Sequence, residues 1–430
     1  MADLLIRVAT ADDVAAAGAL TAEAYHSDGL IDDADEYREE LLDAERRAHE
    51  ATLLVALVPV GSDAASMALV GTITLAPAGC SYAEIAEPGE FEVRMLAVAP
   101  EARRRGIAEA LTRAAMREAV TLGAGRVVLS TLEAMTTAHR LYRRLGFAAE
   151  PERDWHHEGV ALRVYAWDVP AGPGIRVETA VWRPREVRDV DGWRVGISGG
   201  FTRRANSVVA LAEPDDVPGC IDEVERIYAE AGQPPIFRVC AQSMPEDLDD
   251  LLRARGYRDV AHTLVMVRGD LEEFAGAETD LDPDSDRDEP DGTSSGIAAV
   301  RYLPADRPDE AWLSVWLADR AARPVDRALA ESVVTGARAA FVSALAGGTT
   351  VGVIRAAFAQ DWVGLACLTV EPSVRGRGIG RALTRDALRV AATGGTRRAF
   401  LQVEESNEAA IALYEGLGFT PAERYHYRQR

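Results

Sequence analysis

A basic, glycine-containing loop occurs twice in this chain, at equivalent places 272 residues apart. The first copy reads Arg103-Arg-Arg-Gly106-Ile-Ala108, and the second reads Arg375-Gly-Arg-Gly378-Ile-Gly380. Glycine lets the backbone bend so that several N–H groups converge, and the arginines add positive charge. Each loop precedes an Ala/Leu/Arg stretch of helical period, and a helix N-terminus also favours negative charge. The pattern therefore predicts two cradles for a phosphate or pyrophosphate.

The sequence around each loop is also repeated. An apolar run that ends at a proline precedes each loop, which predicts strands over residues 91–98 and 363–370. A Leu-Tyr pair containing Tyr142 or Tyr414 and a Leu-Gly-Phe turn follow at the same offset in both copies. Repetition of this kind indicates duplicated units. We therefore expect two copies of one site.

Loop, Leu-Tyr pair and Leu-Gly-Phe turn, taken together and in this order, resemble the GNAT superfamily of acyl-CoA-dependent N-acyltransferases. The resemblance covers residues 1–168 and 296–430. The second copy is the fuller match, because Asn407 opens an Asn-x-x-Ala-x-x-Leu-Tyr helix that is similar to the family's own. The first copy departs from the pattern here, since Met135 stands where Asn407 stands.

The resemblance implies that acetyl-CoA binds as the acyl donor cosubstrate. The loops would hold its pyrophosphate, and a backbone N–H of the splayed or bulged strand before each loop would meet its thioester. The residues that the resemblance assigns to donor binding are Leu96, Ala97, Val98, Arg103, Arg104, Arg105, Gly106, Ile107 and Ala108 in the first copy, and Leu368, Thr369, Val370, Arg375, Gly376, Arg377, Gly378, Ile379, Gly380 and Asn407 in the second.

Acyl transfer to an amine needs a neutral acceptor, stabilisation of the carbonyl oxygen and a proton for the departing thiolate. The resemblance implies that Tyr142 and Tyr414 are general acids; the alternative is that each is a half-buried residue packed beside a leucine. Glu92 on the first strand is a candidate base, or else an ordinary strand-edge carboxylate. For the second site three candidate bases stay open, namely Asp361, Glu404 and Glu405.

The chain of 430 residues is long enough for two to three domains. We predict an α/β protein with tandem GNAT-like domains, each a mixed twisted sheet with helices on both faces. The predicted segments are an N-terminal domain over residues 1–170, a degenerate half-domain over 171–270, an acidic linker over 271–295, and a C-terminal domain over 296–430.

The middle segment carries an eroded third copy of the repeat, in which Gly256-Tyr257 takes the place of Leu-Gly-Phe. Acidic residues, among them Asp216, stand where the basic loop should be, and they would repel a pyrophosphate. A structural role is therefore expected. Residues 199–207 resemble a segment of actinobacterial acetyltransferases that pair a degenerate half with a working domain; the alternative for Arg203 to Asn206 is a tight turn.

The composition of the chain limits the kinds of binding partner that we expect. The net charge of −22 argues against a nucleic-acid partner, because binding a polyanion needs a basic face. The four cysteines lie far apart without metal-ligand spacing, so we expect reduced thiols and no metal. No segment approaches eighteen apolar residues, so we expect no membrane association and a cytoplasmic location.

The sequence thus predicts an N-acetyltransferase that moves an acetyl group directly to a primary amine of a small molecule or peptide. The alternative is one catalytic C-terminal domain, with the N-terminal unit serving as a non-catalytic acyl-CoA-sensing or interaction module. The acidic stretch 32–40 either attracts a cationic acceptor or forms a solvated face. A homodimer stays open, as does the identity of the acceptor.

Overall fold

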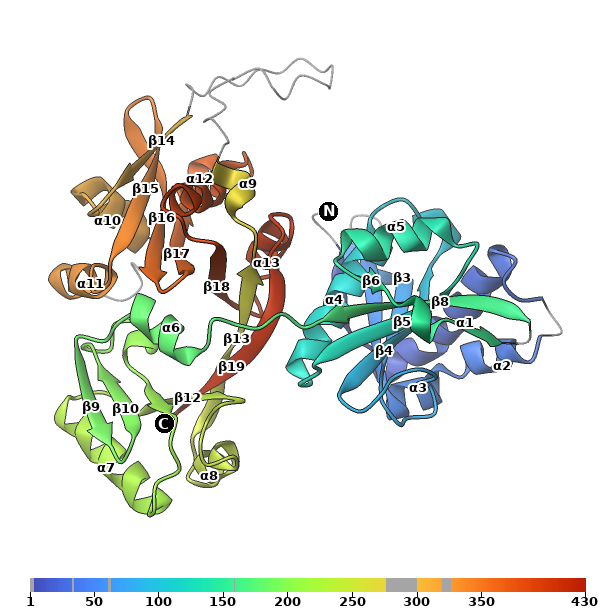
Figure 1. Cartoon of the computed structure of the whole chain (residues 1–430), viewed down its shortest axis with the longest axis horizontal. Coiled ribbons are helices and arrows are strands. Elements are labelled where there is room, and N and C mark those ends of the chain that lie inside the picture. Colours follow the sequence, from blue (N-terminus) through green and yellow to red (C-terminus); the bar gives the residue numbers. More distant parts are fainter. Residues whose placement is uncertain (1–3, 33–34, 61–62, 158, 276–299, 319–325) are drawn as a thin grey trace. The chain divides into compact units, whose positions relative to one another are not determined.

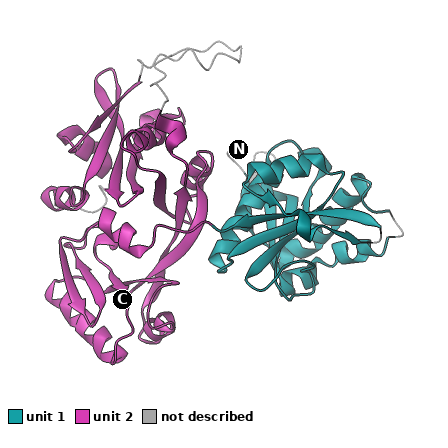
Figure 2. Cartoon of the chain, in the orientation of Figure 1, with its two compact units in different colours: residues 1–169 teal, residues 170–430 magenta. Residues whose placement is uncertain are grey.

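The computed structural model describes residues 4–32, 35–60, 63–157, 159–275, 300–318 and 326–430. The chain forms two compact units, unit 1 (Met1–Val169) and unit 2 (Pro170–Arg430), shown in Figures 1 and 2. Each unit is built on one large mixed sheet with helices packed against it, so the predicted α/β class is confirmed. None of the helices described is long and apolar enough to cross a membrane.

Unit 1 contains an eight-stranded sheet in the order β1-β2-β3-β4-β5-β8-β6, with β7 paired to β8. Strands β4 and β5 are parallel, whereas the other pairs are antiparallel. The elements are β1 (Leu5–Val8), α1 (Ala11–Ser27), α2 (Tyr37–Leu42), α3 (Ala44–Glu50), β2 (Thr52–Val60), β3 (Asp63–Pro77), β4 (Glu90–Val98), α4 (Ile107–Thr121), β5 (Arg126–Leu132), α5 (Thr136–Arg144), β6 (Ala148–Ala149), β7 (Trp155–His157) and β8 (Val160–Asp168).

Both faces of the first sheet are covered, because successive side chains of a strand point to opposite faces. On β2, Leu53 and Val55 pack into a cluster with residues of α1 and α3. Leu54 and Ala56 of the same strand pack into the cluster that contains α4 and Tyr142. The two layers of helices therefore hold β4 and β5 between them.

Unit 2 contains an eleven-stranded sheet in the order β14-β15-β16-β17-β18-β13-β19-β12-β11-β10-β9. The elements are α6 (Ile175–Val181), β9 (Glu186–Val190), β10 (Trp193–Ile197), β11 (Val208–Ala210), α7 (Val217–Glu230), β12 (Ile236–Cys240), α8 (Leu248–Ala254), β13 (Arg258–Arg268), α9 (Glu272–Ala275), β14 (Val300–Ala305), α10 (Glu310–Ala318), α11 (Arg327–Val334), β15 (Ala339–Ala346), β16 (Thr349–Ala359), β17 (Trp362–Val370), α12 (Ile379–Thr393), β18 (Arg398–Glu404), α13 (Glu408–Glu415) and β19 (Thr420–Gln429).

Strand β16 shows the same two-faced packing in unit 2. Val353 and Ala357 join a cluster with residues of α6, α10 and α11. Ile354 and Ala356, which alternate with them, join the cluster that contains α12 and α13. We call these the α10 face and the α12 face of the second sheet.

The centre of the second sheet is made by strands from both halves of unit 2. Strand β13, from the middle segment, lies between β18 and β19 of the C-terminal segment and is antiparallel to both. Strand β19 in turn lies between β13 and β12. In unit 1 the corresponding neighbour of β5 is β8, the last strand of the same segment. Each half of unit 2 thus supplies the strand that completes the other half, as the interleaved colours in Figure 1 show.

The eroded third copy has the same local geometry as the two full copies. Gly146, Gly256 and Gly418 all have φ between 79° and 94°, a conformation that glycine adopts without strain. The residue after each glycine donates its N–H to the fifth residue before it, as Tyr257 does to the carbonyl of Leu252 at 3.0 Å. The acidic residues of this copy do not form an anion cradle. The Asp216 carboxylate instead accepts a hydrogen bond from the N–H of Gly219 at 3.0 Å. This carboxylate occupies the N-terminus of α7.

The predicted linker lies mostly outside the described residues. The described part of the linker, α9, packs against α12, and Leu271 before it is wholly buried. Strands β13 and β19 share one sheet, so the middle and C-terminal segments form a single compact unit. The predicted boundaries within residues 171–430 stay a prediction.

Candidate active site

Strands β4 and β5 of unit 1 separate where the predicted thioester contact lies. They pair from Glu90 with Arg126 to Val93 with Leu129, and both continue beyond that point without pairing to each other. Strand β4 also bulges against β3 in this region, where Met95 has a φ of 51°. A bulge leaves backbone groups outside the ladder and re-aims them. The predicted segment Leu96–Ala97–Val98 follows this bulge directly.

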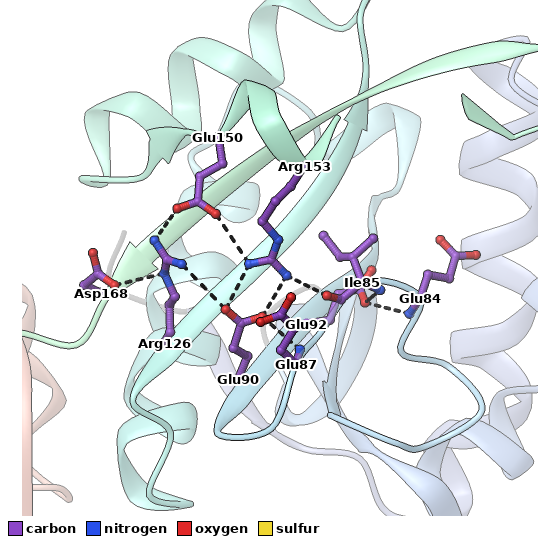
Figure 3. A network of polar contacts seen from close by, with 9 residues as sticks. All are labelled: Glu84, Ile85, Glu87, Glu90, Glu92, Arg126, Glu150, Arg153 and Asp168. Atoms are coloured by element: carbon purple, nitrogen blue, oxygen red, sulfur yellow. Dashed lines mark hydrogen bonds and ion pairs between the residues drawn. The ribbon is translucent and has the colours of Figure 1, made fainter. Parts of the chain in front are cut away.

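Ion pairs hold the opposite ends of these strands together, as Figure 3 shows. Arg153 binds both carboxylate oxygens of Glu90 at 2.9 Å. Arg126, at the start of β5, pairs with Glu150 and lies 3.7 Å from Glu90. The strands are therefore fixed at one end and open at the other.

The loop after β4 has the backbone that an anion cradle needs. Gly106 has a φ of 76° and directly precedes α4, while Arg104 has a φ of 60°. The first four N–H groups of a helix have no partner within it. Those of α4 therefore lie at the end of a loop in which Arg104 and Arg105 are exposed. This arrangement fits the pyrophosphate of a nucleotide-type ligand.

Unit 2 repeats this geometry. Strands β17 and β18 pair only as far as Leu365 with Leu401, and β17 bulges at Cys367, which has a φ of 62°. Gly376 and Gly378 both have a φ of 76°, and a Cβ added to either would meet nothing within 4 Å. The space in front of both glycines is therefore open to a ligand.

The first arginine of each loop braces the loop. The Nε of Arg375 donates to the carbonyl of Val370 at 2.8 Å, and the Nε of Arg103 donates to that of Val98 at 3.4 Å. Arg103 also pairs with Asp28 at 2.6 Å. These two guanidinium groups hold the loop on the strand end, whereas the side chains of Arg104, Arg105 and Arg377 are exposed.

Both tyrosines of the Leu-Tyr pairs lie in apolar surroundings. Tyr142 is 6% exposed and packs its ring 5.8 Å from that of Phe147. Tyr414 is half-buried, with its ring 5.9 Å from that of Phe419. Burial raises the pKa of each tyrosine to about 12. Both hydroxyls therefore keep their protons near neutral pH and can act as donors.

Glu92 is a wholly buried carboxylate on β4, three residues before the bulge. One of its oxygens accepts from the N–H groups of Glu84 and Ile85, at 2.7 and 2.8 Å (Figure 3). The other oxygen has no hydrogen-bond partner among the described residues and lies 3.7 Å from Arg94. Burial raises the pKa of Glu92 above its ordinary value. A carboxylate of this kind binds a proton more readily than an exposed one.

Unit 2 has no carboxylate at the corresponding position, which Gly364 occupies. A Cβ there would lie 2.8 Å from Phe400 and 2.9 Å from Val181, so the sheet has no room for a side chain. Asp361 pairs with Arg398 at the far end of β17, Glu405 pairs with Arg424, and Glu404 lies 3.5 Å from Arg203. The choice among these three candidates therefore stays open.

The Asn407 side chain caps α13, because its oxygen accepts from the N–H of Ala410 at 3.1 Å. Met135 precedes α5 at the equivalent place and cannot cap it in this way. The asparagine therefore fixes the start of the helix that carries Tyr414. Its assignment to donor binding stays a prediction.

Residues 199–207 form a tight turn organised by Asn206, whose side-chain oxygen accepts from the N–H groups of Ser198 and Gly200 at 2.7 and 2.9 Å. The turn directs Arg204 toward β18, where it donates to Gln402 at 2.8 Å. Its guanidinium also lies 4.4 Å from the ring of Trp182. The middle segment thus reaches the separated strands of the C-terminal segment.

Two residues of this region were not predicted from the sequence. Arg355 is wholly buried on β16, donates to the carbonyl of Val181 at 2.9 Å, and lies 5.2 Å from the ring of Trp182. Arg355 could have been noticed in the sequence, because it is a charged residue inside the apolar run Val-Gly-Val-Ile-Arg-Ala-Ala-Phe. No sequence pattern pointed to Trp182, because it lies far from β16 in the sequence.

Two histidines of unit 1 lie at the surface. His156 and His157 are exposed on β7. Residues 33 and 34 of the acidic stretch lie outside the described residues. Within the described ranges, no group of three or more His, Cys, Asp or Glu is arranged to hold a metal ion.

Two family models match the chain. Residues 177–428 match the family described as "Probable histone acetyltransferase Rv0428c C-terminal", which is more than half of the chain. Residues 20–147 match the family described as "Acetyltransferase (GNAT) family". Each model covers one of the two sites described above.

Individual proteins are similar over parts of the chain. An uncharacterized N-acetyltransferase, YobR, of Bacillus subtilis is 25% identical over 260 residues, covering 59% of this chain and 96% of that protein. The mycothiol acetyltransferase of Streptomyces avermitilis is 32% identical over 137 residues, or 30% of this chain and 44% of that protein. A solved structure, a GCN5-related N-acetyltransferase from Kribbella flavida, has a TM-score of 0.42 and 14% identity, covering 59% of this chain and 91% of that one.

Proposed function

This chain belongs to the family described as "Probable histone acetyltransferase Rv0428c C-terminal" and to the GNAT superfamily, and we propose that it transfers the acetyl group of acetyl-CoA directly to a primary amine of a small molecule or peptide. The membership establishes an N-acetyltransferase that uses acetyl-CoA. The amine class, the direct transfer and the part played by each unit are the proposal.

The observation that carries the proposal is the duplicated combination of bulged strand, separated strands and glycine-capped helix. An acyl-CoA brings a pyrophosphate and a thioester, which need convergent N–H groups at one place and backbone donors at another. Both units offer these groups in sequence along one strand and one loop. The cradle residues around Gly106 and Gly378 would hold the pyrophosphate, and Leu96 to Val98 and Leu368 to Val370 would meet the acyl group.

The side chains supply the proton transfers. Tyr142 and Tyr414 hold their protons at neutral pH and would donate them to the departing sulfur. In unit 1, Glu92 would accept the proton of the acceptor amine, directly or through water, because one oxygen of its carboxylate accepts no hydrogen bond from the described residues. In unit 2 a base at this position is missing, so the acceptor has to reach the site as the neutral amine or use another group.

We propose that both units are catalytic. Unit 1 keeps a buried carboxylate beside its bulge and a buried tyrosine, which a module that only senses acyl-CoA would not need. Unit 2 keeps the open glycine loop and the asparagine-capped tyrosine helix. The alternative of a non-catalytic unit 1 is tested by the same variants.

The test is turnover with acetyl-CoA and a panel of primary amines, small molecules and peptides alike. The readouts are release of the CoA thiol and the mass of the acetylated amine. We expect acetylation of at least one amine, lost when Gly106 and Gly378 are both replaced by glutamate. Thiol release without an acetylated amine would contradict direct transfer to an amine.

A further inference from the structure

Two guanidinium groups lie beside one tryptophan ring on the α10 face of unit 2. The guanidinium of Arg204 lies 4.4 Å from the centre of the Trp182 ring, and that of Arg355 lies 5.2 Å from it. We call Arg204 and Arg355 the arginine pair. Trp182 and Arg204 come from the middle segment, whereas Arg355 comes from β16 of the C-terminal segment.

The arginine pair lacks a counter-charge. Among the described residues, no carboxylate lies within ion-pair distance of either guanidinium, and Arg204 donates to the neutral amide of Gln402. The Nε and one Nη of Arg355 are buried without any hydrogen-bond partner in this part of the chain. Burial lowers the pKa of Arg355 to about 10, so the group still carries its charge at neutral pH.

A nearby arginine of the same unit shows the arrangement that the pair lacks. Arg238, equally buried, donates to the carboxylate of Glu178 at 2.8 Å. Unpaired buried charge is costly, and proteins normally neutralise it with a partner. The arginine pair therefore has the electrostatics of a site whose negative partner arrives from outside the described chain.

The arginine pair lies beside the bulge of β17, where the thioester is proposed to bind. Arg355 pairs across the strands with Ala366, the residue before the bulge at Cys367. Burial raises the pKa of Tyr414, and the positive charge of Arg204 opposes that rise, so Arg204 lies close enough to the tyrosine to act on it. An anion bound by the pair would thus sit beside the point where the amine must attack.

Resting on the proposed function, we propose that the acceptor of unit 2 is an amine that also carries an oxyanion, a carboxylate or a phosphate, which binds to the arginine pair. Arg204 is partly exposed and would contact the oxyanion directly. Arg355 is wholly buried and would act through its positive potential. Guanidinium is suited to both ligands, because its planar fork matches carboxylate and phosphate oxygens.

Unit 1 differs at the same place, which gives the two sites different acceptors. Its face beside the bulge carries Glu92, and Arg94 there pairs with Glu84 at 2.9 Å. In unit 2, Gly364 stands at the position of Glu92 and Ala366 at that of Arg94, while Arg355 lies opposite Ala366 on the neighbouring strand. A cationic or neutral amine suits unit 1, whereas an anionic amine suits unit 2.

The test compares matched acceptors on the full chain carrying Gly106→Glu, which removes donor binding from unit 1. One pair is 4-aminobutyrate and its amide; the other is 3-aminopropyl phosphate and 3-aminopropanol. We expect kcat/KM for the anionic member of at least one pair to exceed that of its neutral twin about tenfold or more, as a charged hydrogen bond supplies. The pair that is discriminated tells carboxylate from phosphate.

Variants locate the effect. Arg204→Gln is expected to abolish the preference, and Arg355→Met to reduce it, whereas Arg203→Gln on the same turn keeps it. Equal rates within both pairs, or a preference that survives Arg204→Gln, would overturn the proposal. Calorimetric binding of acetyl-CoA to the same variants separates the outcomes: if the donor binds and no preference is seen, the anion site alone is wrong, and if the donor does not bind to unit 2, the proposed function of unit 2 is wrong.

Discussion

The two buried tyrosine hydroxyls are the residues on which the proposed proton donation depends. Each has a pKa of about 12 because of burial, so its proton is present throughout the neutral range. Positioned general acids contribute about 10²- to 10⁴-fold to a rate. Replacing either one with phenylalanine removes the proton while keeping the packed ring.

For Tyr142→Phe and Tyr414→Phe we expect kcat at the altered site to fall by about 10²-fold or more, while the affinity for acetyl-CoA stays within about twofold. Each variant is measured with the other site silenced by glutamate in its glycine loop, and calorimetry gives the donor affinity. Full turnover at both sites would show that the tyrosines only pack.

Glu92 gives a pH prediction for unit 1. Burial raises the pKa of its carboxyl, and the base must be ionised to accept a proton. The value of kcat/KM at this site should therefore increase as the pH rises through that elevated pKa. Glu92→Gln should lower kcat/KM about 10²- to 10⁴-fold and remove this limb of the profile.

The control for this prediction is Glu87→Gln, an exposed carboxylate of the adjoining loop. It should leave both the rate and the profile unchanged. An unaltered profile in Glu92→Gln would assign the base to another group.

At the residue scale, the sequence predicted the groups that lie within one repeated motif. The loops and the tyrosines could be found because their spacing is local and occurs twice. Arg355 and Trp182 were missed, since they meet only through packing of distant segments. Spacing along the chain carries no information on such a contact.

At the scale of elements, the shared sheet of unit 2 depends on ties between the middle segment and β19. The clearest is Asp249 of α8, which accepts from Arg428 through two bonds of 2.7 Å and contacts His426 at 2.7 Å. The bonds to Arg428 lower the pKa of Asp249 to about 2. The carboxylate therefore stabilises the folded state above its ordinary pKa, and this contribution is lost as the pH falls from about 4 toward 2.

Asp249→Asn should lower the free energy of unfolding of unit 2 at pH 7 by about 1–3 kcal/mol. The difference from the wild type should shrink as the pH falls from about 4 to 2. Urea unfolding at several pH values measures it. Asp250→Asn is the control, because Asp250 is exposed and its ion pair among the described residues lies within its own helix, with Arg253; an equal loss in both variants would contradict the tie.

The strands before the two glycine loops and the helices after them could be predicted from apolar periodicity, but the assembly of the strands into sheets could not. The sequence predicted neither β19 at residues 420–429 nor the strands β9, β10 and β11 within residues 186–210. The pairing of β13 and β19 with strands of the other segment could not be predicted either. The residue pattern of each strand is compatible with several neighbouring strands.

For the whole molecule, duplication has kept the backbone of the two glycine loops and changed the side chains beside the bulged strands. Both loops have the same backbone, down to a φ of 76° at Gly106 and Gly378. The surroundings of the bulges differ in charge, with a buried carboxylate in unit 1 and, among the described residues, an arginine pair without an ion-pair partner in unit 2. One chain would then acetylate two kinds of amine with one donor.

The central claim is that both glycine loops bind acetyl-CoA, and calorimetric titration of the intact chain tests it most directly. Gly106→Glu and Gly378→Glu place a negative charge in the cradles, while Gly123→Glu and Gly395→Glu impose similar backbone strain at the far ends of α4 and α12. We expect two sites in the wild type and both controls, and one site in each cradle variant. A single site lost only with Gly378→Glu, or no binding at all, would contradict the account.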